Sequence, residues 1–313
     1  MPTIAGVVDR AFRFGLQVGD APSRESWRDR ARRAEDLGFD TILIPDHVVD
    51  GLFSPVAALC GMADATSSIR VGTFVLNNDF RHPALLAREA ATVDLLAGGR
   101  LELGLGAGHA APEYAEIGLG FDRASVRVER LEESVGILRR LFDGETVTVG
   151  GKHYRLREHR LYPPRRPTLL VGGNGDRVLR LGARMADIVG LTGTGRTLPD
   201  GQRHAAEWET SQIDAKIAVV RRAAGGRLDQ LELNALVQYI EITEDRRAAV
   251  EPVAAYVGGD PDVMLAAPYL LIGTVDEIVE QLHRARDRWG FTYFVTRSAK
   301  RTGQVIAAIR SQQ

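Results

Sequence analysis

Cysteine is almost absent from the sequence, and its scarcity excludes whole classes of protein. Of 313 residues only Cys60 is a cysteine, so the chain forms no internal disulfide and no zinc site with several thiolates. Residues 56–60 are apolar, and we interpret Cys60 as a small buried hydrophobe. The seven histidines include no H-x-H and no H-E-x-x-H, so we predict no metal site and disfavour a metal hydrolase.

An excess of one charge sign and a long hydrophobic run are also missing. The formal net charge is −1, which gives no basic footprint for nucleic acid. No apolar run approaches the ~20 residues of a membrane span, and residues 1–6 lack the basic-then-apolar order of a signal peptide. The sequence also lacks the G-x-S-x-G motif of a hydrolase nucleophile and has no P-loop. We therefore expect a cytoplasmic protein with no nucleic-acid or membrane partner.

What the sequence does contain is a regular alternation of short β-type runs and longer helical runs. We predict eight strands, at residues 12–18, 40–44, 70–76, 100–105, 168–171, 187–191, 232–242 and 291–296. Helices are predicted at residues 23–37, 55–65, 83–96, 125–142, 176–185, 207–224, 245–257 and 275–289. Strands separated by helices form parallel sheets with right-handed crossovers. Eight such units predict an α/β fold, a (β/α)8 TIM barrel, rather than a doubly wound sheet.

Two segments interrupt the alternation. Residues 145–156 read as a β-hairpin within an irregular stretch that continues to residue 166. Residues 192–204 are polar and carry several glycines, which is typical of a mobile loop. We therefore expect one domain over residues 1–313, with an insertion around 145–166 and a mobile loop around 192–204.

In such barrels the active site lies at the carboxyl ends of the strands, and this rule selects polar residues after the second and third strands. Asp46 and His47 follow the second strand and offer a carboxylate beside an imidazole that titrates near neutral pH. A turn in which Asp46 caps a helix explains the pair equally well. Asn77 closes the third strand, where its amide suits either the edge of a heterocycle or a turn.

Glycine-rich segments follow the fourth and fifth strands. Gly106, Ala107 and Gly108 precede His109, and the lack of a side chain at the glycines lets the backbone approach a flat ligand closely. This segment lacks a complete G-x-G-x-x-G and a suitably spaced acidic residue, so dinucleotide binding is disfavoured.

The second glycine-rich segment comprises Gly172, Gly173, Asn174 and Gly175 and precedes a predicted helix. Backbone N–H groups at a helix N-terminus point at anions, so we favour a phosphate site here over a plain tight turn.

Together these segments resemble the bacterial luciferase-like monooxygenase superfamily. The likeness extends over residues 12–297 and rests on residues 34–40, 45–47, 71–76, 81–87, 98–108, 130–133, 171–175, 186–187 and 272–274. Within the superfamily the chain is most similar to the oxidoreductases that use coenzyme F420, a deazaflavin that transfers hydride. The resemblance implies F420 as cofactor, with FMN on the same fold as the alternative, and a homodimer.

The resemblance also implies roles for single residues. A non-prolyl cis peptide at Phe74–Val75 would support the concave back of the deazaflavin ring, Asp46 would bond the ring, and His47 would exchange a proton with substrate. The remaining cofactor contacts would be Asn77 at the pyrimidine edge, Gly106, Ala107 and Gly108 under the ring and ribityl chain, and Gly172, Gly173, Asn174 and Gly175 beside the phosphate.

One position departs from the family pattern. The glucose-6-phosphate dehydrogenases of this family carry a catalytic glutamate where this chain has His109, so their substrate does not carry over, and His109 becomes a second catalytic candidate. We predict an F420-dependent oxidoreductase that acts on an unidentified small organic substrate. An FMN-dependent monooxygenase and a non-catalytic cofactor-binding protein remain alternatives.

Overall fold

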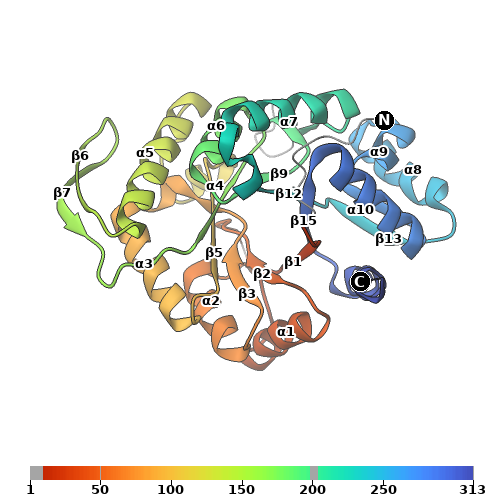
Figure 1. The fold of residues 1–313 in the computed structure, drawn as a ribbon, viewed down its shortest axis with the longest axis horizontal. Coiled ribbons are helices and arrows are strands. Elements are labelled where there is room, and N and C mark those ends of the chain that lie inside the picture. Colours follow the sequence, from red (N-terminus) through yellow and green to blue (C-terminus); the bar gives the residue numbers. More distant parts are fainter. Residues whose placement is uncertain (1–9, 50, 198–203, 313) are drawn as a thin grey trace.

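A closed barrel of eight parallel strands forms the centre of the computed structural model, which describes residues 10–49, 51–197 and 204–312 (Figure 1). Strand β15 pairs with both β1 and β12, and β3 pairs with β5, so hydrogen bonds run around the whole barrel. This arrangement confirms the predicted TIM barrel. Its strands are β1 (Arg13–Gln17), β2 (Thr41–Ile44), β3 (Arg70–Thr73) continued by β4 (Leu76–Asn77), β5 (Leu101–Gly106), β8 (Thr168–Gly172), β9 (Ile188–Leu191), β12 (Glu232–Leu236) and β15 (Phe291–Thr296).

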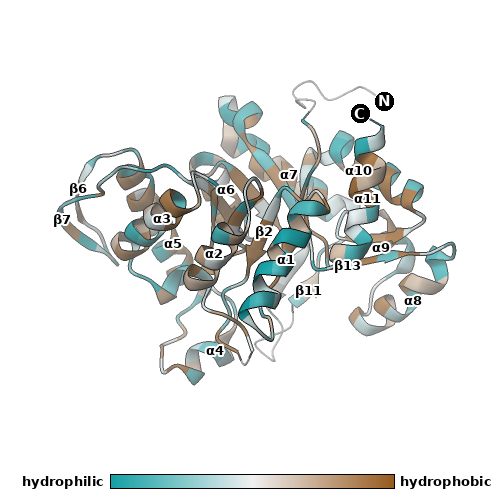
Figure 2. Ribbon diagram, turned by 90° about the horizontal axis from the view of Figure 1, so that it is seen from below, coloured by the Kyte–Doolittle hydropathy of each residue, from teal (hydrophilic) through white to brown (hydrophobic). Residues whose placement is uncertain are grey.

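Helices surround the barrel, and local signals in the sequence set their ends. The Ser23 hydroxyl accepts a hydrogen bond from the Ser26 N–H and begins the first helix, while Pro55 and Pro83 occupy first-turn positions that need no N–H donor. Figure 2 shows mainly hydrophilic residues along the outward face of the first helix and a hydrophobic β2 behind it. The surrounding helices are α1 (Arg24–Asp36), α2 (Pro55–Ala65), α3 (Pro83–Leu96), α5 (Ala124–Phe142), α6 (Asp176–Met185), α7 (Thr210–Ala224), α10 (Val275–Trp289) and α11 (Ala299–Ser311).

Several elements differ from the expectations. The strand predicted at 232–242 divides into β12 and β13 (Tyr239–Ile242), and β13 leaves the barrel to pair with β14 (Leu270–Gly273). Four elements have no counterpart among the predicted ones, namely β14, α9 (Pro261–Ala266), α11 and the short helix α4 (Ala111–Glu116), while α8 (Arg246–Val257) matches its predicted helix. Cys60 is only partly buried against the core.

Two antiparallel strand pairs lie outside the barrel. Strands β6 (Thr146–Gly150) and β7 (Arg155–Arg160) form a hairpin that is longer than the one expected at 145–156. Within the segment expected to be a loop, β10 (Thr194–Thr197) pairs with β11 (His204–Ala206), and residues 198–203 between them lie outside the described residues. In the described part of the chain, no helix is long and apolar enough to cross a membrane.

The cis peptide expected at Phe74–Val75 is present and divides β3 from β4. The Val75 side chain lies inside the barrel, where three glycines leave room for it. A Cβ at Gly104, Gly106 or Gly172 would lie 3.0, 2.7 or 3.1 Å from the Val75 methyl groups. The barrel interior here is apolar, with Phe74 in the same buried cluster as Leu43, Leu170, Ile188, Leu236, Tyr293 and Val295.

Candidate active site

The buried Asp46 and the partly buried Arg81 form an ion pair where β2 ends. The Arg81 Nη1 lies 2.5 Å from the Asp46 Oδ2, and the Asn77 N–H donates to the same oxygen at 2.9 Å. The Asp46 side chain is only 6% exposed. Its carboxylate therefore holds the loop after β4 against β2, and Arg81, which the sequence analysis did not select, neutralises its charge.

His47 follows on the same strand end and pairs with Glu113. Its Nδ1 lies 2.7 Å from the Glu113 Oε1, while the Glu113 Oε2 accepts a hydrogen bond from the Val48 N–H at 3.0 Å. A carboxylate only accepts hydrogen bonds, so the Nδ1 of His47 donates and its Nε2 is left for a ligand. Glu113 is buried on α4, and the sequence analysis missed it because that helix shows no periodic signal.

A row of three imidazoles crosses the mouth of the barrel. The His47 and His109 rings meet edge to face with centroids 5.4 Å apart, and the His109 and His204 rings are 4.9 Å apart. The row joins the end of β2, the loop after β5 and strand β11. Although His109 is exposed to solvent, its pKa is lowered to about 4. The main cause is that the protein around the ring displaces water, and the neighbouring His204 and His47 lower the pKa further.

Asn77 is held by its neighbours rather than standing free in the site. Its Oδ1 accepts hydrogen bonds from the Tyr114 hydroxyl at 3.0 Å and from the Asp79 N–H at 3.1 Å. Gly108 has a positive φ of 75°, and a Cβ there would lie 2.2 Å from the Tyr114 hydroxyl, so this close approach requires glycine. Ala107 packs, partly buried, against the core.

The turn Gly172–Gly175 leads from β8 into α6, as expected. A Cβ at Gly175 would meet nothing within 4 Å, so open space borders the N-terminus of the helix. The Asn174 Nδ2 donates to the Thr192 Oγ1 at 2.6 Å and to the Thr194 Oγ1 at 3.1 Å. Asn174 therefore anchors the base of the β10–β11 pair as well as the turn.

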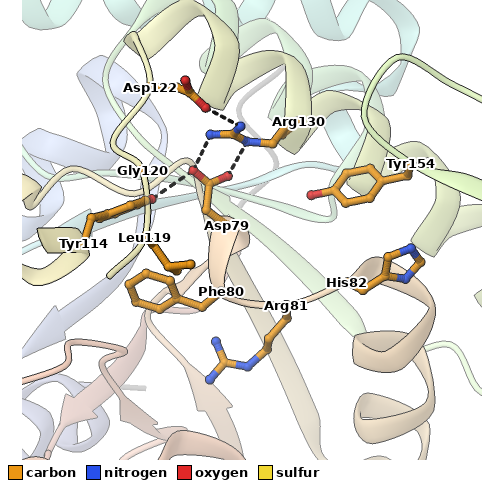
Figure 3. Close-up of a pocket in the computed structure, with 10 residues that line it drawn as sticks. All are labelled: Asp79, Phe80, Arg81, His82, Tyr114, Leu119, Gly120, Asp122, Arg130 and Tyr154. Atoms are coloured by element: carbon orange, nitrogen blue, oxygen red, sulfur yellow. Dashed lines mark hydrogen bonds and ion pairs between the residues drawn. The ribbon is translucent and has the colours of Figure 1, made fainter. Parts of the chain in front are cut away.

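A cavity of about 450 Å³ adjoins this site (Figure 3). Figure 3 shows Asp79 between Arg130 and Tyr114, and the Arg130 Nε and Nη2 each lie 2.8 Å from an oxygen of Asp79. The cavity connects to the site through Arg81 and Tyr114, which contact Asp46 and Asn77. Its lining residues are Asp79, Phe80, Arg81, His82, Tyr114, Leu119, Gly120, Asp122, Arg130 and Tyr154.

The described residues contain no group of three or more His, Cys, Asp or Glu side chains that would hold a metal ion. The polar groups at the carboxyl ends of the strands are thus a buried ion pair, a histidine–glutamate pair, further imidazoles and a glycine turn. Such an arrangement suits a bound organic ligand and a proton transfer beside it.

The sequence model of luciferase-like monooxygenases matches residues 6–293. The chain therefore belongs to the luciferase-like monooxygenase family.

Among curated relatives, an F420-dependent glucose-6-phosphate dehydrogenase from Microbacterium testaceum is 34% identical over 163 residues, which are 49% of this chain and 48% of that protein. The chain thus matches about half of that relative's length. The enzyme of the same name from Beutenbergia cavernae is 29% identical over 84% of each chain. A solved F420-dependent secondary alcohol dehydrogenase, in complex with an F420–acetone adduct, has a TM-score of 0.73 at 20% identity and covers 96% of this chain and 100% of its own.

Proposed function

We propose that this chain is an F420-dependent oxidoreductase, which moves a hydride between C5 of the deazaflavin and a small organic substrate. The observation that carries the proposal is the 2.7 Å contact of His47 with Glu113 at the carboxyl end of β2, where barrels present catalytic groups. The names of the curated relatives support the choice of cofactor.

The residues present fit a flat ring with a phosphate tail. Val75 and the cis peptide supply a bulge on which a ring can rest, and the Asn77 Nδ2 makes no hydrogen bond within the described residues. The open turn beside Gly175 leaves the first N–H groups of α6 accessible to a phosphate. When bound, F420 supplies the hydride-transfer centre.

His47 is the group we propose for the accompanying proton. Glu113 fixes its tautomer, so the Nε2 accepts a proton from, or returns one to, a heteroatom of the substrate. His109 does not suit that task as an acid, because a pKa of about 4 leaves it neutral at pH 7. A neutral His109 can still hydrogen-bond the substrate.

Titrations of the protein with F420 and with FMN, followed by fluorescence, test the cofactor. We expect F420 to bind at least about tenfold more tightly than FMN, a difference of about 1.4 kcal/mol. Tighter FMN binding, or flavin that co-purifies stoichiometrically, would instead favour a monooxygenase. F420 binding without turnover across a panel of alcohols and carbonyl compounds would favour a non-catalytic binding protein.

Variants of the histidine–glutamate pair test the proton transfer. We expect His47→Asn to lower kcat about 10²–10⁴-fold while F420 affinity changes by less than about tenfold. Glu113→Gln should lower kcat less and shift its pH profile, because it acts through His47. His153→Asn and Glu129→Gln are matched controls, since they alter a histidine–glutamate contact of 3.3 Å beside the β6–β7 hairpin. Near wild-type turnover by His47→Asn would exclude His47 as the proton carrier.

We further propose, on the family resemblance, that the enzyme is a cytoplasmic homodimer. Sedimentation equilibrium of the purified protein tests the oligomeric state, and a monomer at micromolar concentration would contradict it.

A further inference from the structure

Arg297 lies at the carboxyl end of β15 on the inner side of the barrel. Side chains alternate between the two faces of a strand. Tyr293 and Val295 belong to the apolar cluster inside the barrel, so Arg297 continues the inward series one residue after β15 ends. Its side chain is exposed, which places it at the open mouth rather than in the packed interior.

The Arg297 guanidinium is held in place by an uncharged partner. Its Nε donates to the Gln17 Oε1 at 2.8 Å, and the Gln17 Nε2 donates to the Phe74 carbonyl at 2.9 Å. Gln17 is the last residue of β1, so this chain of hydrogen bonds crosses from β15 to the bulge after β3. The two Nη atoms of Arg297 make no hydrogen bond with any residue that the structure describes.

Arg297 also lacks a carboxylate partner among the described residues. In contrast, Arg13 pairs with Glu102 at 2.9 Å and Arg81 with Asp46 at 2.5 Å. Although the side chain is exposed, the protein around the guanidinium displaces water from it, and this desolvation lowers the pKa of Arg297. A fixed guanidinium with two free N–H edges is suited to bind a carboxylate or a phosphate.

We infer that Arg297 is the anchor for an anionic group, a carboxylate or a phosphate, on the substrate. This inference rests on the proposed function and deepens it, because it makes the substrate an anionic small molecule. In the order of barrel strands, β15 is separated from β2 only by β1, whereas β12 and β9 separate it from β8. An anion on Arg297 is thus near the His47 side of the mouth, and the turn Gly172–Gly175 remains for the cofactor phosphate.

Calorimetric titration of the F420-loaded protein with inorganic phosphate and with acetate tests the anchor. Relative to wild type, we expect Arg297→Gln to weaken phosphate binding at least about tenfold and Arg297→Lys to weaken it less. Arg301→Gln is the matched control, because it removes the same charge from an arginine that already pairs with Glu241 at 2.6 Å. We expect it to change phosphate affinity by less than about twofold.

Equal phosphate affinity in wild type and Arg297→Gln, or no phosphate binding by wild type, would overturn the inference. A tenfold loss of F420 affinity in Arg297→Gln, with phosphate affinity unchanged, would assign the residue to cofactor binding. That result would also overturn the inference. Should wild type bind no F420, the proposed function fails. In that case the phosphate affinities of Arg297→Gln and Arg301→Gln, measured on the cofactor-free protein, still show whether Arg297 binds an anion.

Paired substrates add a second readout. Glucose 6-phosphate is compared with glucose, and lactate with 2-propanol, so that the members of each pair differ in the anionic group. In wild type we expect kcat/KM to be at least about tenfold higher for the anionic member of a pair that is turned over, and Arg297→Gln to remove that preference. A wild-type preference for the neutral member would contradict the assignment.

Discussion

His109 shows how its surroundings decide what a histidine can do. Desolvation of the ring by the surrounding protein is the main cause that lowers its pKa to about 4, and the neighbouring His204 and His47 add to it. In the unfolded chain His109 would have a pKa of about 6.5. The stability that the folded state gains from an uncharged His109 is therefore complete only above that pH. This contribution declines as the pH falls from about 6.5 towards 4. At neutral pH the uncharged ring can still hydrogen-bond a ligand, which is consistent with our proposal that His47 carries the proton.

Removal of His204 tests this electrostatic coupling. His204→Gln replaces an imidazole whose ring lies 4.9 Å from that of His109, so we expect the pKa of His109 to rise. The pKa of His109 should stay below the ordinary histidine value, because desolvation of the ring, the larger cause, remains. NMR titration of the His109 ring protons gives the pKa directly. An unchanged pKa would show that His204 exerts no field on His109.

At the scale of elements, the bulge between β3 and β4 controls the shape of the site. The Val75 side chain occupies the space that Gly104, Gly106 and Gly172 leave empty. These glycines are therefore explained first by packing within the barrel, because a side chain there would collide with the bulge. The same packing fixes the position of the bulge that we propose as the cofactor's support.

A double-mutant cycle tests the packing of Val75. In Gly106→Ala the new Cβ would lie 2.7 Å from the Val75 Cγ2, so we expect a loss of about 1–3 kcal/mol in unfolding free energy. Adding Val75→Ala should recover much of that loss, because the methyl groups in conflict are gone. Gly104→Ala is the control, since its Cβ would lie 2.2 Å from the Thr73 carbonyl oxygen, which Val75→Ala does not remove. Urea unfolding measures all variants, and strictly additive losses would contradict the argument.

Local signals explain which elements the sequence predicts well. Helices α2 and α3 begin where predicted because a proline marks the first turn of each. The run from 232 to 242 reads as one strand because its apolar residues continue beyond Leu236, where the chain leaves the barrel. Glu113 reaches His47 only through the tertiary fold, 66 residues along the chain, so no local pattern reveals it. Asp46 and His47 were predicted from their place after the second strand, their side-chain chemistry and the family resemblance, whereas their partners Arg81 and Glu113 were not predicted as site residues.

At the scale of the whole molecule, the two ends of the barrel carry different polar groups. The carboxyl end holds the candidate active site, whereas charged side chains that form ion pairs fill the amino end. There the Arg13 Nη2 lies 2.9 Å from the Glu102 Oε2 and its Nη1 lies 2.5 Å from the Glu232 Oε2. The Tyr293 hydroxyl donates to the Glu102 Oε1 at 2.8 Å. In TIM barrels the amino-terminal end serves stability rather than catalysis.

Substitution of Glu102 tests this division of labour. Its carboxylate is fully buried, and among the described residues Glu102→Gln removes one of the two carboxylates that form ion pairs with Arg13 and leaves Glu232. We expect a loss of about 1–3 kcal/mol in unfolding free energy, because a buried amide cannot replace the carboxylate oxygens that accept hydrogen bonds from Arg13 and Tyr293. Glu280→Gln, in an exposed pair with Arg284, should cost less than about 0.5 kcal/mol. Urea unfolding gives the free energies and F420 titration the affinities.

The two variants should bind F420 equally well, because Glu102 lies at the opposite end of the barrel from the proposed cofactor site. Equal stability of Glu102→Gln and Glu280→Gln would mean that desolvation cancels the attraction within the buried cluster. A selective loss of F420 affinity in Glu102→Gln would mean that the amino end also shapes the site. Such coupling would have to pass through the apolar layer around Leu43 and Val295, which separates the ions from Gln17 and Arg297.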